Sequence, residues 1–375
     1  MKSSSVSQSN HSVRTVQPKS RIWNIVKSGI LILVIFVVVV TAFGAGYQLV
    51  GTWQDARRFP QQGRSIPLGT DFGNTSLNLD CSGLGRPTVV LDSGIGVPAI
   101  GWIKVQPEVA KFTRVCSYDR AGYGWSDAGQ EPRTSVQIAR ELRTLLTAAG
   151  EVGPYILVGH SFGGFNVREF TKLYPVDVSG VVLVDGAHED EEKRISEILP
   201  YTVVEQEERI DLRNAKLNQF LTPLRIHLGI QRLEVATGWG TPNYGVLQSK
   251  QDFPKIFRQE LLYLRQQKKF QDAVASESKA FAESIAQVRA AGNLGDCPLI
   301  VLTAGLPYPP DPLLTKEEMN KESDLWINVL QAQEAHLSSR GKQIIVPDSS
   351  HMIPFKRPDR VIDAIREVFG QVSGK

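Results

Sequence analysis

The chain has 375 residues, of which 42% are hydrophobic and 22% are charged, and its formal net charge is +3. These proportions are ordinary for a globular protein and exclude a largely disordered chain or a multi-pass membrane protein. Five basic residues lie in the first 27 positions, which contain no Asp or Glu, so the rest of the chain is close to neutral. The sequence therefore lacks the one-sided basic surface that nucleic-acid binding requires.

The amino-terminal region predicts a membrane anchor. Residues 1–28 are polar and basic, whereas Ser28 to Gln54 contain no charged residue and Ile30 to Val40 are continuously apolar. A helix needs roughly 20 apolar residues to cross the hydrocarbon core of a bilayer. We expect a disordered cytoplasmic tail over residues 1–28 and a transmembrane helix over residues 29–51, because basic flanks stay in the cytoplasm. The following domain is then outside the cytoplasm.

A cleaved signal peptide is the alternative to an anchor. Ala42-Phe43-Gly44 offers small residues at the spacing of a cleavage site, and the segment Ile30 to Val40 alone has the length of a signal-peptide core. Weak hydrophobicity that continues through Val50 favours retention of the helix as a signal-anchor. In both cases the domain leaves the cytoplasm, as a membrane-anchored or a secreted protein.

The three cysteines give little evidence of a disulfide framework. Cys81, Cys116 and Cys297 match neither a C-x-x-C redox pair nor the spacing of a zinc site. Cys116 lies in a short apolar run that predicts a strand, so we expect a buried free thiol there. A bridge between Cys81 and Cys297 is the pairing left open.

Residues 68–375, after a linker over residues 52–67, predict one α/β domain. Short apolar runs alternate with helical patterns, which is typical of a mostly parallel sheet flanked by helices. Between about residues 189 and 291 only charged amphipathic helices are predicted, and this insertion is placed where a lid could cover the carboxyl ends of the strands. The predicted strands are Thr88 to Leu91, Val115 to Tyr118, Tyr155 to Val158, Val181 to Val184, Leu299 to Leu302 and Gln343 to Val346.

Three motifs carry chemistry. Gly159-His160-Ser161-Phe162-Gly163 follows a predicted strand and precedes a predicted helix, the setting in which G-x-S-x-G exposes a serine hydroxyl on a sharp turn. Asp119 to Ser126 reads D-R-A-G-Y-G-W-S, and Asp348-Ser349-Ser350-His351-Met352 follows the last predicted strand. Together these motifs resemble the α/β-hydrolase family over roughly residues 70 to 370. The resemblance implies that fold, with Ser161 as the nucleophile.

A serine hydroxyl needs a neighbouring base, and the base needs an acid that fixes its tautomer. The resemblance implies His351 as that base. Many family members place the acid after the strand Leu299 to Leu302, but no carboxylate follows here until Asp311. Others use the carboxylate that ends the preceding strand, and Asp185 occupies that position. We therefore expect Asp185 in preference to Asp311.

Acyl transfer also needs N–H groups aimed at the developing oxyanion. By resemblance, one comes from Phe162, directly after the nucleophile. The second comes from the glycine loop Asp92-Ser93-Gly94-Ile95-Gly96, in which Ile95 is the expected donor.

These residues imply hydrolysis of a carboxylic ester or thioester through an acyl-enzyme on Ser161. Acyl transfer to another acceptor, or other serine-dependent chemistry of the family, stays open. Dehalogenases and epoxide hydrolases of this architecture carry Asp as nucleophile and are disfavoured. The alternative of another class is a non-catalytic, membrane-anchored binding module. No metal or organic cofactor is implied, and the expected partners are a small acyl substrate and the membrane, with no nucleic acid.

Overall fold

An eight-stranded sheet forms the centre of the computed structural model, which describes residues 19–237, 255–306 and 313–374. The strand order is β1-β2-β4-β3-β5-β6-β7-β8. Strands β3 to β8 run parallel, whereas β1 and β2 pair antiparallel at one edge. The strands are β1 (Arg64–Pro67), β2 (Ser76–Ser82), β3 (Thr88–Asp92), β4 (Val115–Tyr118), β5 (Tyr155–His160), β6 (Val178–Val184), β7 (Leu299–Ala304) and β8 (Gly341–Val346).

The six predicted strands are all present, and the α/β-hydrolase fold expected from the sequence is confirmed. Every residue of β3, β5 and β7 is buried, because helices cover both faces of a parallel sheet. Strands β1 and β2 escaped prediction. In both strands polar residues alternate with apolar ones, so they lack the continuous apolar run of the central strands.

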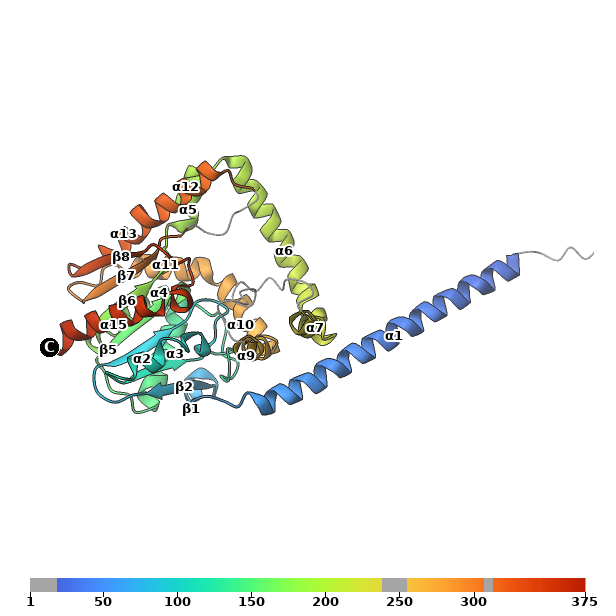
Figure 1. Ribbon diagram of the computed structural model, residues 1–375, viewed down its shortest axis with the longest axis horizontal. Coiled ribbons are helices and arrows are strands. Elements are labelled where there is room, and N and C mark those ends of the chain that lie inside the picture. The colour runs from blue at the N-terminus through green and yellow to red at the C-terminus, as the bar shows by residue number, and fades with distance from the viewer. Residues whose placement is uncertain (1–18, 238–254, 307–312, 375) are drawn as a thin grey trace, which may run out of the picture.

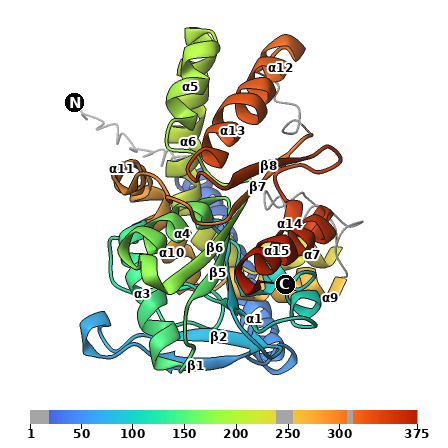
Figure 2. The ribbon, with the colours of Figure 1, turned by 90° about the vertical axis from the view of Figure 1, so that its left-hand side faces the viewer.

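Helices cover the sheet on both faces (Figures 1 and 2). Apolar side chains of α3, α4 and α13 join one buried cluster with the strands, and those of α2 and α15 join a second cluster across the sheet. Each fully buried Leu, Ile or Val contributes roughly 1.5–3 kcal/mol to folding. These helices are α2 (Gln106–Val109), α3 (Ser135–Ala148), α4 (Phe162–Leu173), α13 (Gln331–Ala335) and α15 (Pro358–Ser373).

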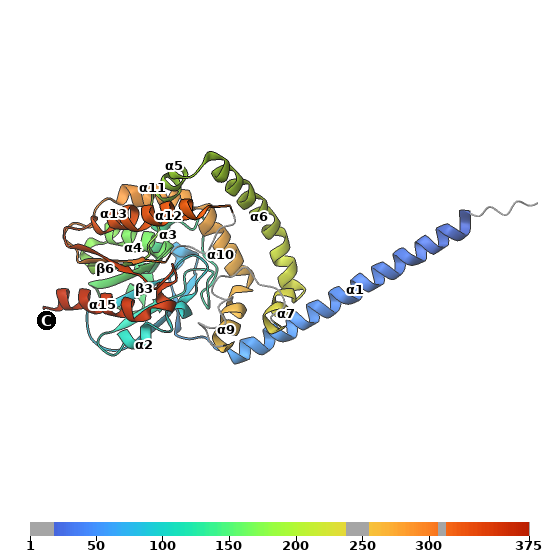
Figure 3. The same cartoon turned by 45° about the horizontal axis from the view of Figure 1, so that its top comes forward.

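The insertion between β6 and β7 is helical in its described parts. Most of its helices lie beside one end of the sheet, whereas the last of them packs against α3 and α4 (Figures 1 and 3). Residues 238–254 lie outside the described residues. The helices are α5 (Glu191–Ile198), α6 (Tyr201–His227), α7 (Ile230–Thr237), α9 (Lys255–Arg265), α10 (Lys268–Lys279) and α11 (Phe281–Ala291). After β7 come α12 (Lys316–Asp324), a π-helical turn (Leu325–Leu330) that leads into α13, and, after β8, α14 (Ile353–Lys356).

Helix α1 spans Lys19–Arg58 and contains the predicted anchor, residues 29–51. It extends away from the domain (Figure 1), and every residue from Trp23 to Phe43 is exposed. It is apolar and long enough to cross a membrane. The predicted linker over residues 52–67 is wrong at both ends. The helix continues to Arg58, and β1 joins the sheet because Ile66 is buried opposite Leu77 of β2.

The cysteines pair differently from the expectation. Cys81 of β2 and Cys116 of β4 form a disulfide, whereas Cys297 is a half-buried free thiol. The predicted free thiol at Cys116 and the Cys81–Cys297 pairing are therefore wrong. The antiparallel register of β2 and β4 places Cys81 directly opposite Cys116. Because β2 was not predicted, this neighbourhood could not be read from the sequence.

Candidate active site

Ser161 lies at the sharp turn between β5 and α4. Its φ is 54° and its ψ is −124°, a conformation that side-chain-bearing residues rarely adopt. A Cβ on Gly159 would lie 2.4 Å from the carbonyl oxygen of Gly163, so the turn closes only with glycine at this position. The strand, turn and helix match the geometry of a nucleophile elbow.

Asp185 directly follows β6 and contacts His351. The Nδ1 atom of His351 lies 2.7 Å from Oδ2 of Asp185. The other carboxylate oxygen accepts hydrogen bonds from the Ala304 N–H at 2.8 Å and from Nε1 of Trp326 at 3.0 Å. Asp185 is 1% exposed, whereas solvent reaches 28% of the His351 side chain. A carboxylate only accepts hydrogen bonds, so Nδ1 of His351 carries the hydrogen and Nε2 is left as the base.

Ser161 and Asp185 are held side by side at the carboxyl end of the sheet. The Ser161 N–H donates to the carbonyl of Val184 at 3.2 Å, and the Ala187 N–H donates to the carbonyl of Ser161 at 3.0 Å. Asp185 itself has a positive φ of 46°. The structure thus brings Ser161, Asp185 and His351 together at the carboxyl ends of the strands. Asp311 lies outside the described residues.

The pKa of His351 is above its usual value of 6.5. Burial alone would lower this pKa, but the hydrogen bond and negative charge of Asp185, together with the charge of Glu191, raise it on balance. A raised pKa makes His351 a stronger base toward a serine hydroxyl. Glu191, at the start of α5, is a neighbour that sequence reasoning missed. Its pKa is raised to about 7, chiefly by burial.

His160, within the G-x-S-x-G motif, contacts the loop that carries His351. Its Nε2 lies 3.0 Å from the carbonyl oxygen of His351, and the two rings lie 4.9 Å apart. Burial and then the neighbouring charge of His351 lower the pKa of His160 to about 3. His160 therefore stays neutral at physiological pH and contacts the backbone of the His351 loop.

The predicted oxyanion loop, residues 92–96, packs directly against Ser161. A Cβ on Gly94 would lie 3.0 Å from Cβ and 3.4 Å from Oγ of Ser161. Phe162 is the first residue of α4, so its N–H has no partner within the helix. The loop that carries Ile95 thus lies against the Ser161 side chain, and the Phe162 N–H directly follows Ser161 in the chain.

A buried arginine donates hydrogen bonds to the predicted oxyanion loop, residues 92–96. Arg120 donates to Oδ1 of Asp92 at 2.8 Å, to the carbonyl of Ser93 and, at 3.1 Å, to the carbonyl of Gly94. Its remaining donors reach Glu277 of α10 at 2.7 and 2.9 Å. Both side chains of the Arg120–Glu277 pair are at most 2% exposed. The insertion therefore supplies a buried charge that fixes the arginine under the loop.

Tyr123 extends the same network. Its hydroxyl donates to Glu277 at 2.5 Å and accepts from the Gly96 N–H at 3.0 Å. Burial, and then the charge of Glu277, raise the pKa of Tyr123 well above its usual value, so the hydroxyl keeps its proton. Sequence reasoning missed Glu277, because nothing in the sequence pairs α10 with residues more than 150 positions earlier.

The D-R-A-G-Y-G-W-S motif is a structural loop. Asp119 accepts hydrogen bonds from the Ala99 N–H at 2.8 Å and from Asn78 at 2.9 Å. A Cβ on Gly124 would lie 2.2 Å from the Asp119 carboxylate, and Ser126 donates back to the Asp119 carbonyl at 2.6 Å. The motif fixes the turn that carries Arg120 and Tyr123.

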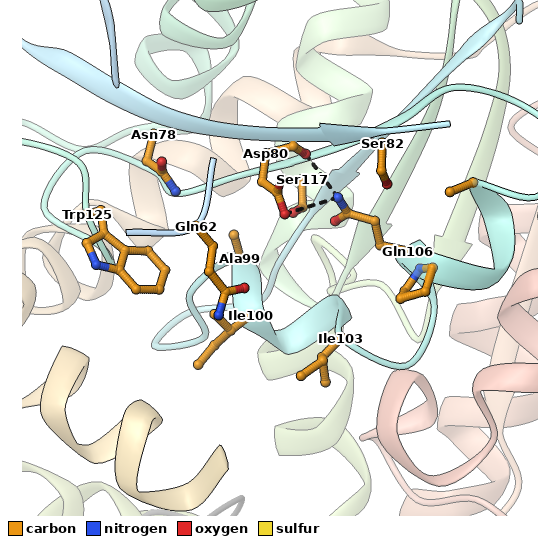
Figure 4. A pocket seen from close by; sticks show the side chains of 12 residues that line it. Gln62, Asn78, Asp80, Ser82, Ala99, Ile100, Ile103, Gln106, Ser117 and Trp125 are labelled. Carbon is orange, nitrogen blue, oxygen red and sulfur yellow. Dashed lines mark hydrogen bonds between the residues drawn. The ribbon is translucent and has the colours of Figure 1, made fainter. Parts of the chain in front are cut away.

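Two open spaces lie in different parts of the domain. A pocket of about 260 Å³ lies between β2, α2 and the loop near Trp125 (Figure 4), where Gln106 donates to Asp80. None of the three candidate catalytic residues lines this pocket. The second space is a cleft of about 730 Å³ between α5, the start of α6, α11 and α12. Its lining includes His188, Glu191, Ile195, Val204, Phe281 and Glu322.

The cleft adjoins the candidate nucleophile. Phe281, on its wall, packs against Phe162 with ring centroids 5.7 Å apart. On the Asp185 side of the imidazole only about 10 Å³ is open, enclosed by Leu306, Trp326 and neighbours. Of these spaces, the cleft is the one that both contacts the residue after Ser161 and has room for an acyl group.

Known proteins match both the sequence and the fold. The family model described as "Alpha/beta hydrolase family" matches residues 89–364. A stretch of 109 residues is 35% identical to the "Probable transporter efuK" of Hormonema carpetanum, and it covers 28% of this chain but 16% of that protein. Among solved structures, Cfl2 of Burkholderia cenocepacia has a TM-score of 0.56 at 18% identity, with 82% of this chain and 95% of that one covered.

A thermophilic esterase of Thermogutta terrifontis has a TM-score of 0.50 at 20% identity, with 83% of this chain and 99% of that chain covered. At these identities the structural likeness concerns the fold. Because the family model covers most of the chain, this protein belongs to the alpha/beta hydrolase family. The family expected from the sequence is thereby confirmed.

Proposed function

We propose that this protein is a serine hydrolase that cleaves a carboxylic ester or thioester through an acyl-enzyme on Ser161. The observation that carries the proposal is the strained turn at Ser161 beside a His351–Asp185 pair at 2.7 Å. Acyl transfer to an acceptor other than water uses the same acyl-enzyme and is the second form of the proposal. The substrate is a small molecule with an acyl group that enters by the cleft beside Phe281.

The proposed reaction has two halves. Nε2 of His351 takes the proton of the Ser161 hydroxyl as Oγ attacks the carbonyl carbon, and the N–H groups of Ile95 and Phe162 hold the oxyanion. The protonated His351 then gives its proton to the leaving alcohol or thiol. Water, activated by the same nitrogen, hydrolyses the acyl-enzyme and releases the acid. Asp185 holds the imidazole and stabilises its cation throughout.

We further propose that α1 anchors the enzyme in a membrane and that the catalytic domain lies outside the cytoplasm. The exposed apolar stretch of α1 supports the anchor. The disulfide between Cys81 and Cys116 supports the location, because disulfides persist in oxidising compartments and are rare in the cytosol. The helical insertion, beside the cleft and Phe162, is placed where a lid could act.

Covalent labelling tests the proposal. We expect a fluorophosphonate to label the detergent-solubilised chain, Ser161→Ala to abolish labelling, and His351→Ala to slow it by orders of magnitude. Ser339→Ala, an exposed serine in the turn before β8, is the matched control and keeps full labelling. The acyl-enzyme is then observed with p-nitrophenyl acetate as a burst of p-nitrophenol. A folded chain that neither labels nor shows a burst would support the non-catalytic binding module instead.

A further inference from the structure

Helix α6 carries an exposed apolar face that the rest of the described chain does not cover. Leu217, Phe220, Leu221 and Leu224 are 48%, 73%, 38% and 44% exposed. Their spacing of three and four residues places them on one side of the helix. Ile226, on the opposite side, is 8% exposed. Near its carboxyl end the helix therefore buries Ile226, and the four apolar side chains lie exposed on the opposite side.

The same segment is basic. Between Leu212 and Leu228 there is no Asp or Glu, whereas Arg213, Lys216, Arg225 and His227 occur. Arg213 and Lys216 are exposed and flank the apolar face, and Arg225 pairs with Glu234 of α7. Exposed Leu and Phe bordered by Lys and Arg is the composition of helices that lie in the interface of a bilayer.

The end of α6 meets α1 where its exposed apolar stretch ends. A Cβ on Gly44 would lie 2.6 Å from the carbonyl oxygen of Leu228, and a Cβ on Gly229 would lie 2.8 Å from the ring of Tyr47. Trp23 to Phe43 have no such burial. The corner between α6 and α7 is therefore close to the boundary between the proposed span and the domain.

Further along α1, polar contacts fix the orientation. Arg232 of α7 donates to Asp55 at 2.6 Å and to Gln48 at 3.3 Å. Gln48 also donates to Gln266, next to α9, at 3.1 Å. From this joint α6 runs crosswise to α1 in two views (Figures 1 and 3). If α1 crosses a bilayer, α6 extends along its surface.

We propose that the apolar face of α6 (Leu217, Phe220, Leu221 and Leu224) inserts into the surface of the bilayer that α1 spans. Arg213 and Lys216 then reach lipid phosphates, and the side of α6 with Ile226 stays on the protein. This inference rests on the proposed anchoring by α1 and adds a second contact between the domain and the membrane. The domain is thereby held in one orientation, with its insertion toward the lipid.

Spin labels on the full chain in phosphatidylcholine and phosphatidylglycerol vesicles test the inference. In a Cys297→Ser background, which leaves the Cys81–Cys116 disulfide intact, single labels are placed by Phe220→Cys, Leu224→Cys, Asn218→Cys and Val34→Cys. Collision rates with oxygen, which concentrates in lipid, are compared with those of a water-soluble nickel chelate. We expect labels 220 and 224 to favour oxygen and the matched control at 218, on a polar side of α6, to favour nickel several-fold more.

Each of the other outcomes overturns the docking of α6 on the bilayer, for a different reason. Labels at 220 and 224 that favour nickel, while the label at 34 favours oxygen, overturn the docking of α6 but leave the anchor. Labels at 220 and 224 shielded from both reagents indicate a protein partner or a second copy and also overturn it. A label at 34 that favours nickel overturns the anchor, and the inference fails with it. Fluorophosphonate labelling of Ser161, which tests the proposed function, is independent of all three outcomes.

Discussion

At the scale of single residues, the acid beside His351 is the most exacting part of the site. Asp185 uses one oxygen for His351 and the other for Ala304 and Trp326. We expect Asp185→Asn to lower the rate of ester cleavage by about 10⁴-fold, because an amide nitrogen facing Nδ1 selects the wrong imidazole tautomer. Hydrolysis of p-nitrophenyl acetate measures the loss, and circular dichroism verifies the fold.

Asp311→Asn is the comparison that separates the two candidate acids. It is expected to leave the rate unchanged. A fall of the same size in Asp311→Asn, with a mild effect of Asp185→Asn, would move the acid to the loop after β7. Asp190→Asn, at a half-buried aspartate that pairs with Arg289, controls for the loss of one negative charge near the site.

The raised pKa of His351 makes a prediction about pH. The base acts when neutral, so the rate of fluorophosphonate labelling should rise with pH and reach half its maximum above pH 6.5. Asp185→Asn removes the main group that raises this pKa, so its midpoint should shift to lower pH. His336→Gln, at an exposed histidine that directly follows α13, should leave the midpoint unchanged. A wild-type midpoint below 6.5 would contradict the proposed ion pair.

The same shift has a consequence for stability with a defined sign. A group whose pKa is higher in the folded state stabilises the fold when protonated. The contribution of His351 is therefore fully present below about pH 6.5, its unfolded value, and is lost as pH rises through the folded value. The pH that favours catalysis is thus the pH at which this pair adds least to folding.

At the scale of elements, α10 supports the predicted oxyanion loop through one side chain, Glu277, which pairs with Arg120. We expect Glu277→Gln to lower kcat more than it raises KM, because Arg120 would no longer be fixed under the loop that carries Ile95. Breaking a buried ion pair from one side also costs about 3–5 kcal/mol of unfolding free energy. Glu283→Gln, an exposed glutamate on α11, is the matched control for both measurements.

Steady-state kinetics and urea unfolding separate the two effects. If Glu277→Gln loses stability while kcat stays unchanged in the folded enzyme, Glu277 has a structural role only. Partial recovery of kcat in Glu277→Asp, which restores the charge on a shorter side chain, would support the positioning role.

The elements also show which parts of the fold and the site could be predicted from the sequence. The apolar runs of β3 to β8 and the G-x-S-x-G turn depend on neighbours within a few residues, and these were predictable. Trp326 and Glu277 were not, because each contacts the site across more than 140 positions of sequence. Strands β1 and β2 were not predicted from the sequence, for a related reason. Their identity depends on pairing with distant strands rather than on their own composition.

At the scale of the whole molecule, the disulfide joins the edge of the sheet to its interior and reports the compartment of the domain. Reducing it opens a loop of 35 residues, which in the chain-entropy treatment costs about 4 kcal/mol of unfolding free energy. We expect the double variant Cys81→Ser with Cys116→Ser to lower Tm by several degrees, while Ser161 keeps its labelling in the folded state. Cys297→Ser is the control and should change Tm little, since its thiol is unpaired and half-buried.

The same bond distinguishes the two sides of the membrane in living cells. A domain outside the cytoplasm keeps Cys81 and Cys116 oxidised, so a maleimide polymer added to the denatured chain under non-reducing conditions should modify Cys297 alone. After reduction it should modify all three cysteines, a change that is visible as a gel shift. If three cysteines react before reduction, the bond is not formed in cells and the domain faces the cytoplasm. Because the positive residues before the apolar stretch of α1 and the disulfide after it are independent features, agreement between them would fix the topology more firmly than either alone.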